Sequence, residues 1–188
     1  MKKRKLVISF DSPAVLLFAG ICLLALFLDG FTGGRSTAKV FSVYKSSMLD
    51  PMFYVRLFCH VFGHSGFGHL IGNLSLLLVI GPACEKRLGS WKLLLAFAVT
   101  ALMSGIAHIL ISPTTMLLGA SGVVYMLIFL SAVSGATDGE VPLTLILVGI
   151  MYIGQEVYGL FFNDDISQLT HIIGAVCGVL CGRLLTRR

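Results

Sequence analysis

The sequence predicts an all-α membrane protein, folded as one bundle of six transmembrane helices. Of its 188 residues, 56% are hydrophobic and only 12% are charged, a balance that soluble domains do not show. Six apolar windows approach the roughly 20 residues that a spanning helix needs, and short connections join all but the first two. The windows are 13–28, 68–84, 92–111, 120–135, 141–159 and 168–185.

The basic residues predict how the bundle is oriented. Residues 2–5 are all basic and precede the first window, and Arg183, Arg187 and Arg188 close the last one. Because basic residues gather on the cytoplasmic side, we expect both termini in the cytoplasm of a multi-pass protein of the plasma or inner membrane. The basic turn at 86–92 then lies on the same side. The net charge of +5 thus reflects membrane topology, and we expect no nucleic-acid partner.

Three further features of the sequence are its basic start, its cysteines and the charged end of its second window. A basic start before an apolar run is also typical of a signal peptide, but no small-x-small cleavage site follows Leu28. The five cysteines are odd in number and four lie in or beside the windows, so we expect packing residues and no disulfide framework. Glu85, Lys86 and Arg87, at the end of the second window, are expected to be interfacial anchors, and a local ion pair among them stays open.

Two connections are unusual. The long loop at 29–67 contains the aromatic stretch 53–58, which we expect to lie as an amphipathic segment in the membrane interface. The connection at 112–120 is apolar for an aqueous loop. Irregular backbone is tolerated at membrane depth where protein buries it or water reaches it, so we expect this connection to re-enter the membrane.

Ser121 is the first candidate for chemistry, because it opens the fourth window. A serine hydroxyl needs a nearby base to become a nucleophile, and a carbonyl substrate needs donors for its developing oxyanion. The free N–H groups at a helix start supply such donors. Gly119 and Gly122 permit a tight turn and close approach of a substrate, and Tyr125 lies on the same helical face. Small residues at a helix contact are the competing interpretation.

His171 is the best candidate base, since imidazole titrates near working pH. It opens the last window, and Gly174, Gly178 and Gly182 follow on nearly the same face. Such a face admits another helix closely. If that helix is the one headed by Ser121, the packing brings imidazole to hydroxyl. The alternative is a histidine that only forms an interhelical hydrogen bond.

His69 and Asn73 are four residues apart and share a helical face. Both can donate hydrogen bonds to one point, as an oxyanion requires, although polar contacts between helices would use the same residues. His60 and His64 raise the question of zinc, but no His-Glu-x-x-His motif or cysteine cluster completes a site. We expect no metal, with His60 and His64 as hydrogen-bonding loop residues and His108 as a structural one.

Taken together, these residues resemble the rhomboid family of intramembrane serine proteases over about residues 13–185. The resemblance rests on their identity and chain order. They are Arg56, His60, His64, His69, Asn73, Glu85-Lys86-Arg87-Leu88-Gly89, Gly119-Ala120-Ser121-Gly122, Tyr125, and His171 with the glycines that follow it. One departure is Val55, where many members have tryptophan.

The resemblance implies a single domain over residues 1–188, a compact bacterial form with a long, partly membrane-embedded first loop. It implies a dyad of Ser121 and His171 with no acid. Asp164 and Asp165 precede His171 by seven and six residues and could orient it as a triad acid; the resemblance favours solvated loop charges instead, and whether either assists His171 stays open. An oxyanion hole would form from His69, Asn73 and the Ser121 amide. Tyr125 would pack on His171, and Gly119, Gly122, Gly174 and Gly178 would support the site.

The implied activity is cleavage of single-span membrane proteins in or near their transmembrane segments, without a cofactor. The fifth window would act as a lateral gate, and the connection at 159–168, with Phe161 and Phe162, as a lid. Two other classes stay open: a non-catalytic membrane chaperone or adaptor with the same bundle, and a small-solute or metal transporter. The sequence leaves the oligomeric state open.

Overall fold

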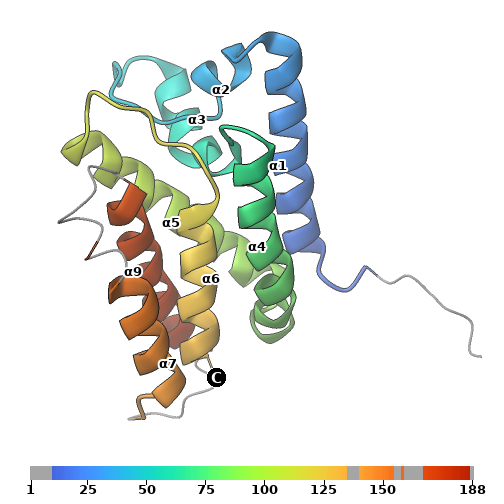
Figure 1. The fold of residues 1–188 in the computed structure, drawn as a ribbon, viewed down its shortest axis with the longest axis vertical. Helices are drawn as coiled ribbons and strands as arrows, with labels where there is room; N and C mark the ends of the chain where they lie inside the picture. Colours follow the sequence, from blue (N-terminus) through green and yellow to red (C-terminus); the bar gives the residue numbers. More distant parts are fainter. Residues whose placement is uncertain (1–9, 135–139, 155–157, 159–166, 187–188) are drawn as a thin grey trace, which may run out of the picture.

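The computed structural model describes residues 10–134, 140–154, 158 and 167–186 (Figure 1). The described chain is helical, with one isolated antiparallel β-bridge between Val43 and Leu117, which confirms the all-α prediction. The helices are α1 (Pro13–Thr32), α2 (Arg35–Lys39), α3 (Pro51–Cys59), the 3-10 turn η1 (His60–Phe62), α4 (Phe67–Leu88), α5 (Ser90–Ile111), α6 (Ser121–Val133), α7 (Leu143–Val148), the π-helical turn η2 (Gly149–Ile153) and α9 (Ser167–Thr186).

Within the described residues, four helices are long and apolar enough to cross a membrane: α1, α4, α5 and α9. The first loop lies at one end of the bundle, which we call the loop end (Figure 1). The other end, where α4 finishes with Lys86 and Arg87, we call the basic end. The two remaining apolar stretches are shorter, at Ser121–Val133 and Leu143–Ile153, so six complete crossings stay a prediction.

Helix α6 forms the centre of the bundle. It packs against α4, α5, α7 and α9, most extensively against α9. Nine of its 13 residues are buried, from Gly122 to Val133, as expected for a helix that is apolar on every side. Its length corresponds to only about 20 Å at 1.5 Å per residue. The connection before it runs from the end of α5 down to the start of α6 (Figure 1).

The expected glycine contact between α9 and α6 is observed. A Cβ atom added at Gly174 would meet the carbonyl oxygen of Gly122, and one added at Gly178 would meet that of Met126. These are backbone atoms, so no side chain can turn aside to make room. Glycine at both positions is what lets α9 approach this closely, in the manner typical of helices packed inside membranes.

Glu85 corrects one prediction, because it is no interfacial anchor. Its side chain is buried and accepts hydrogen bonds from the N–H groups of Ala14 at 2.9 Å and Val15 at 3.0 Å. The hydroxyl of Ser90 donates a third, at 2.6 Å. A carboxylate is well placed there because the first N–H groups of a helix lack internal partners and carry the positive end of its dipole. Glu85 thereby fixes the start of α1 to the basic end of α4.

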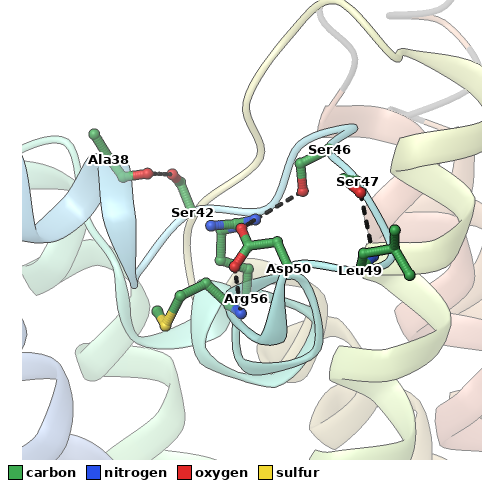
Figure 2. A network of polar contacts seen from close by, with 8 residues as sticks. Ala38, Ser42, Ser46, Ser47, Leu49, Asp50 and Arg56 are labelled. Atoms are coloured by element: carbon green, nitrogen blue, oxygen red, sulfur yellow. Dashed lines mark hydrogen bonds and ion pairs between the residues drawn. The ribbon is translucent and has the colours of Figure 1, made fainter.

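The first loop is held together by Arg56, which is buried (Figure 2). Its Nη2 atom donates to Ser46 Oγ at 2.7 Å and to Asp50 at 3.0 Å, and its guanidinium lies 4.6 Å from the centre of the Tyr44 ring. Asp50 also caps α3 by accepting from Met52 N–H at 2.9 Å. That amide first, and Arg56 second, lower the pKa of Asp50 below its ordinary value. The loop is thus an ordered structure.

Helix α3 has the two unlike faces predicted for residues 53–58. Phe53 and Leu57 are buried, whereas Tyr54, Val55 and Phe58 are exposed. This arrangement fits an amphipathic helix whose outer face contacts lipid headgroups and acyl chains. Its place in the membrane interface stays a prediction.

Candidate active site

Ser121 is the first residue of α6 and is partly exposed. The residue before it, Ala120, has no side chain that caps the helix. The first N–H groups of α6 therefore remain as donors beside the Ser121 hydroxyl, and the positive end of the helix dipole favours negative charge there. The local structure places a serine where an anion would be stabilised.

The turn before Ser121 brings His69 and Asn73 to the same place. Gly119 has φ +127°, a conformation that residues with a side chain rarely adopt. A Cβ atom at Gly119 would lie 3.0 Å from His69 Nε2 and 3.9 Å from Asn73 Nδ2. Both nitrogens on α4 therefore face the turn that leads into Ser121. Any substitution at Gly119 would both strain the turn and meet the imidazole.

The first loop fixes this turn at two points. Val43 and Leu117 exchange both hydrogen bonds of the β-bridge, each at 2.9 Å. The N–H of Gly119 then donates to the backbone carbonyl of His60 at 3.0 Å. Neither contact was predicted, because nothing in the local pattern of either segment marks its partner. The apolar 112–120 connection is thus held by the first loop, with Leu117 and Ala120 buried.

His171 reaches the site from α9. Its imidazole stacks flat on the Tyr125 ring, with centroids 4.2 Å apart and planes 5° from parallel. Tyr125 lies one turn after Ser121 on the same face of α6. The neighbouring Thr170 packs against Gly122 of α6. Its methyl carbon lies 3.0 Å from the position that a Cβ atom on Gly122 would occupy. The imidazole therefore lies over the face of α6 that begins with Ser121.

The other histidines are buried hydrogen-bonding residues near the site. His60 Nε2 lies 3.0 Å from the carbonyl oxygen of Ala101, and His64 Nδ1 lies 3.1 Å from that of Phe62. Burial lowers the pKa of each to about 4, so both are neutral at physiological pH. His108 bonds to the carbonyl of Thr115 at 3.1 Å.

Several predicted features lie outside the described residues. They include Asp164 and Asp165, and Phe161 and Phe162 of the expected lid. Within the described ranges, no group of three or more histidine, cysteine, aspartate or glutamate side chains could hold a metal ion. The five cysteines are free thiols, with Cys22, Cys84 and Cys177 buried.

These features define a helical membrane protein with serine, histidine and amide groups gathered around the start of a buried helix. The Rhomboid domain family matches residues 52–188, which is more than half of the chain. The protein belongs to the rhomboid family.

Curated relatives support this membership. The chain is 29% identical over 137 residues to Rhomboid-related protein 1 of Caenorhabditis elegans, which covers 68% of this chain and 38% of that protein. It is 25% identical over 142 residues to the putative rhomboid protease YdcA of Bacillus subtilis, and the match covers 71% of this chain and 68% of that protein.

It is 34% identical over 130 residues to the rhomboid protease GlpG of Salmonella choleraesuis, covering 66% of this chain and 46% of that protein. The matched region thus spans less than half of the worm and Salmonella relatives.

Proposed function

We propose that this protein is an intramembrane serine endopeptidase that cleaves single-span membrane proteins in or near their transmembrane segments. Family membership and relatives named as rhomboid proteases support this. In the proposal Ser121 is the nucleophile and His171 the general base. His69, Asn73 and the Ser121 amide form the oxyanion hole. Gly119, Gly122, Tyr125, Gly174 and Gly178 support the geometry.

The observation that carries the proposal is the amide of Asn73. The side chain is only 8% exposed, and within the described residues its Nδ2 atom has no hydrogen-bond partner. Leaving a buried donor unpaired costs about 1–3 kcal/mol. This donor faces the turn before Ser121. An oxyanion that forms only during the reaction would satisfy it.

The proposed reaction has two steps. Ser121 Oγ attacks the peptide carbonyl carbon while His171 takes the hydroxyl proton, and the carbonyl oxygen becomes an oxyanion. His171 then gives the proton to the leaving nitrogen as the C–N bond breaks, which leaves an acyl ester on Ser121. In the second step a water molecule, deprotonated by His171, attacks this ester and restores the serine hydroxyl.

The membrane determines which substrates should be preferred. An intact helix keeps its carbonyls in i to i−4 hydrogen bonds, so a segment must unwind before Ser121 can reach one. Glycine and proline near the cut lower the cost of unwinding. We also propose the orientation derived from charge, with both termini in the cytoplasm and the loop end facing outward.

A fluorophosphonate probe tests the proposal, because it labels activated serines. We expect labelling of the purified protein in detergent, and its loss in Ser121→Ala and His171→Ala. Ser131→Ala is the matched control, since it removes a hydroxyl from the same helix ten residues away and should label normally. A folded protein that does not label, or labelling that survives in Ser121→Ala, would contradict the proposal and favour the non-catalytic chaperone.

A further inference from the structure

The imidazole of His69 has different neighbours at its two nitrogens. Nδ1 lies 3.1 Å from Ser65 Oγ and 3.5 Å from the backbone nitrogen of Ser65, whose N–H donates to it. Nε2 faces the Gly119 turn on the other side of the ring. His69 is the third residue of α4, which begins at Phe67. Its side chain therefore reaches back over the start of its own helix.

These contacts determine where the proton of the ring lies. A backbone N–H can only donate, so Nδ1 must be the accepting nitrogen. A neutral imidazole carries one proton, which then lies on Nε2. The Ser65 hydroxyl, at the shorter distance, donates to the same nitrogen. The arrangement resembles a capping box, in which the third helical side chain accepts from an N–H group before the helix.

His64 provides an internal comparison. Its Nδ1 atom lies 3.1 Å from the Phe62 carbonyl oxygen, which can only accept, so this ring carries its proton on Nδ1. The two rings meet edge to face with centroids 5.0 Å apart. Neighbouring histidines are thus held as opposite tautomers by local backbone groups.

We propose that Ser65 is a positioning residue that holds His69 as the neutral tautomer with its proton on Nε2, directed at the oxyanion site. The role in catalysis rests on the proposed function. Without the Ser65 hydroxyl, the ring retains only the longer contact with the backbone N–H. The ring then samples the other tautomer and other orientations, and Nε2 presents a lone pair where the reaction needs a donor.

The tautomer is measured directly by ¹⁵N NMR of the histidine rings in detergent micelles. Only five histidines are present, and His69→Gln assigns the His69 signals. We expect an unprotonated Nδ1 and a protonated Nε2 in the wild type, a mixture in Ser65→Ala, and the wild-type pattern in Ser65→Thr. Ser47→Ala is the matched control, because it removes a loop hydroxyl that bonds only to its own loop. A protonated Nδ1 in the wild type, or no change in Ser65→Ala, would overturn the proposal.

Cleavage kinetics test the consequence for catalysis. Loss of one neutral hydrogen bond predicts a fall in kcat of roughly five- to tenfold in Ser65→Ala, with KM unchanged and kcat restored in Ser65→Thr. If Ser65→Ala left kcat unchanged while Ser121→Ala abolished cleavage, the positioning role would be overturned and the proposed function would stand. A wild type that cleaves nothing yet shows the Ser65-dependent tautomer would instead contradict the proposed function and support the tautomer assignment.

Discussion

Gly174→Ala should weaken the packing of α9 against α6, and it should do so more than Gly182→Ala on the same face. The new Cβ would meet the carbonyl oxygen of Gly122. It would also lie 3.0 Å from the carbonyl carbon of Gly122 and 3.2 Å from the Cα atom of Gly122. Ordinary contact begins at 3.4 Å, so the new Cβ forces α9 away from α6. Overpacking of this kind costs typically 1–3 kcal/mol, while alanine regains about 1 kcal/mol of helix propensity. We expect a net loss of up to about 2 kcal/mol.

Gly182→Ala is the matched control on the same helix. Its Cβ would meet Val133 Cβ at 3.3 Å and the Leu130 carbonyl oxygen at 3.5 Å, which are contacts that a small adjustment relieves. Helix propensity should then leave this variant as stable as the wild type or slightly more stable.

The assay is unfolding by a denaturing detergent, followed by circular dichroism, together with the rate of fluorophosphonate labelling. Labelling should slow in Gly174→Ala, because His171 moves with α9 and small misplacements of catalytic groups are costly. Equal unfolding midpoints for the Gly174 and Gly182 variants would refute the reasoning.

Two other predictions concern stability. Glu85→Gln should lose about 1–3 kcal/mol, since the charged acceptor for the first N–H groups of α1 is removed, whereas Lys86→Gln, at an exposed position, should change little; equal unfolding midpoints would contradict this. Burial lowers the pKa of His60 from 6.5 to about 4, so the stability that its buried neutral form contributes should be fully present above pH 6.5. This contribution, up to roughly 3 kcal/mol, should be lost as the pH falls to about 4. Unfolding midpoints measured across this range should depend less on pH in His60→Gln, and His64 should contribute to the slope that remains; an unchanged profile would contradict the assignment.

The fold was largely predictable from hydropathy, because apolar length and helix-start signals are local properties of the chain. Ser121 begins α6 in the structure, and the glycines after His171 face α6 as their spacing predicted. The length of α6 was less predictable. The window at 120–135 did not reveal how far Ser121 lies below the end of α5, since that depends on where the preceding connection is held.

Other contacts between distant segments could not be predicted from the sequence. Glu85 was misread because its partners, Ala14 and Val15, precede it by 71 and 70 residues. The local sequence around a charged residue at a helix end is the same whether the residue faces solvent or another helix. The bridge between Val43 and Leu117 has no signal in either segment, because backbone groups pair without regard to side-chain identity.

By itself the sequence determined that the protein is a helical membrane protein and which residues are candidates for serine chemistry, because apolar periodicity and the reactivity of serine and histidine are properties of individual residues. Only the tertiary structure decided that His69, Asn73 and His171 meet around the start of α6. That meeting depends on how closely α9 can pack and on where the first loop holds the Gly119 turn. Both depend on contacts between segments far apart in the chain, which no local sequence pattern predicts.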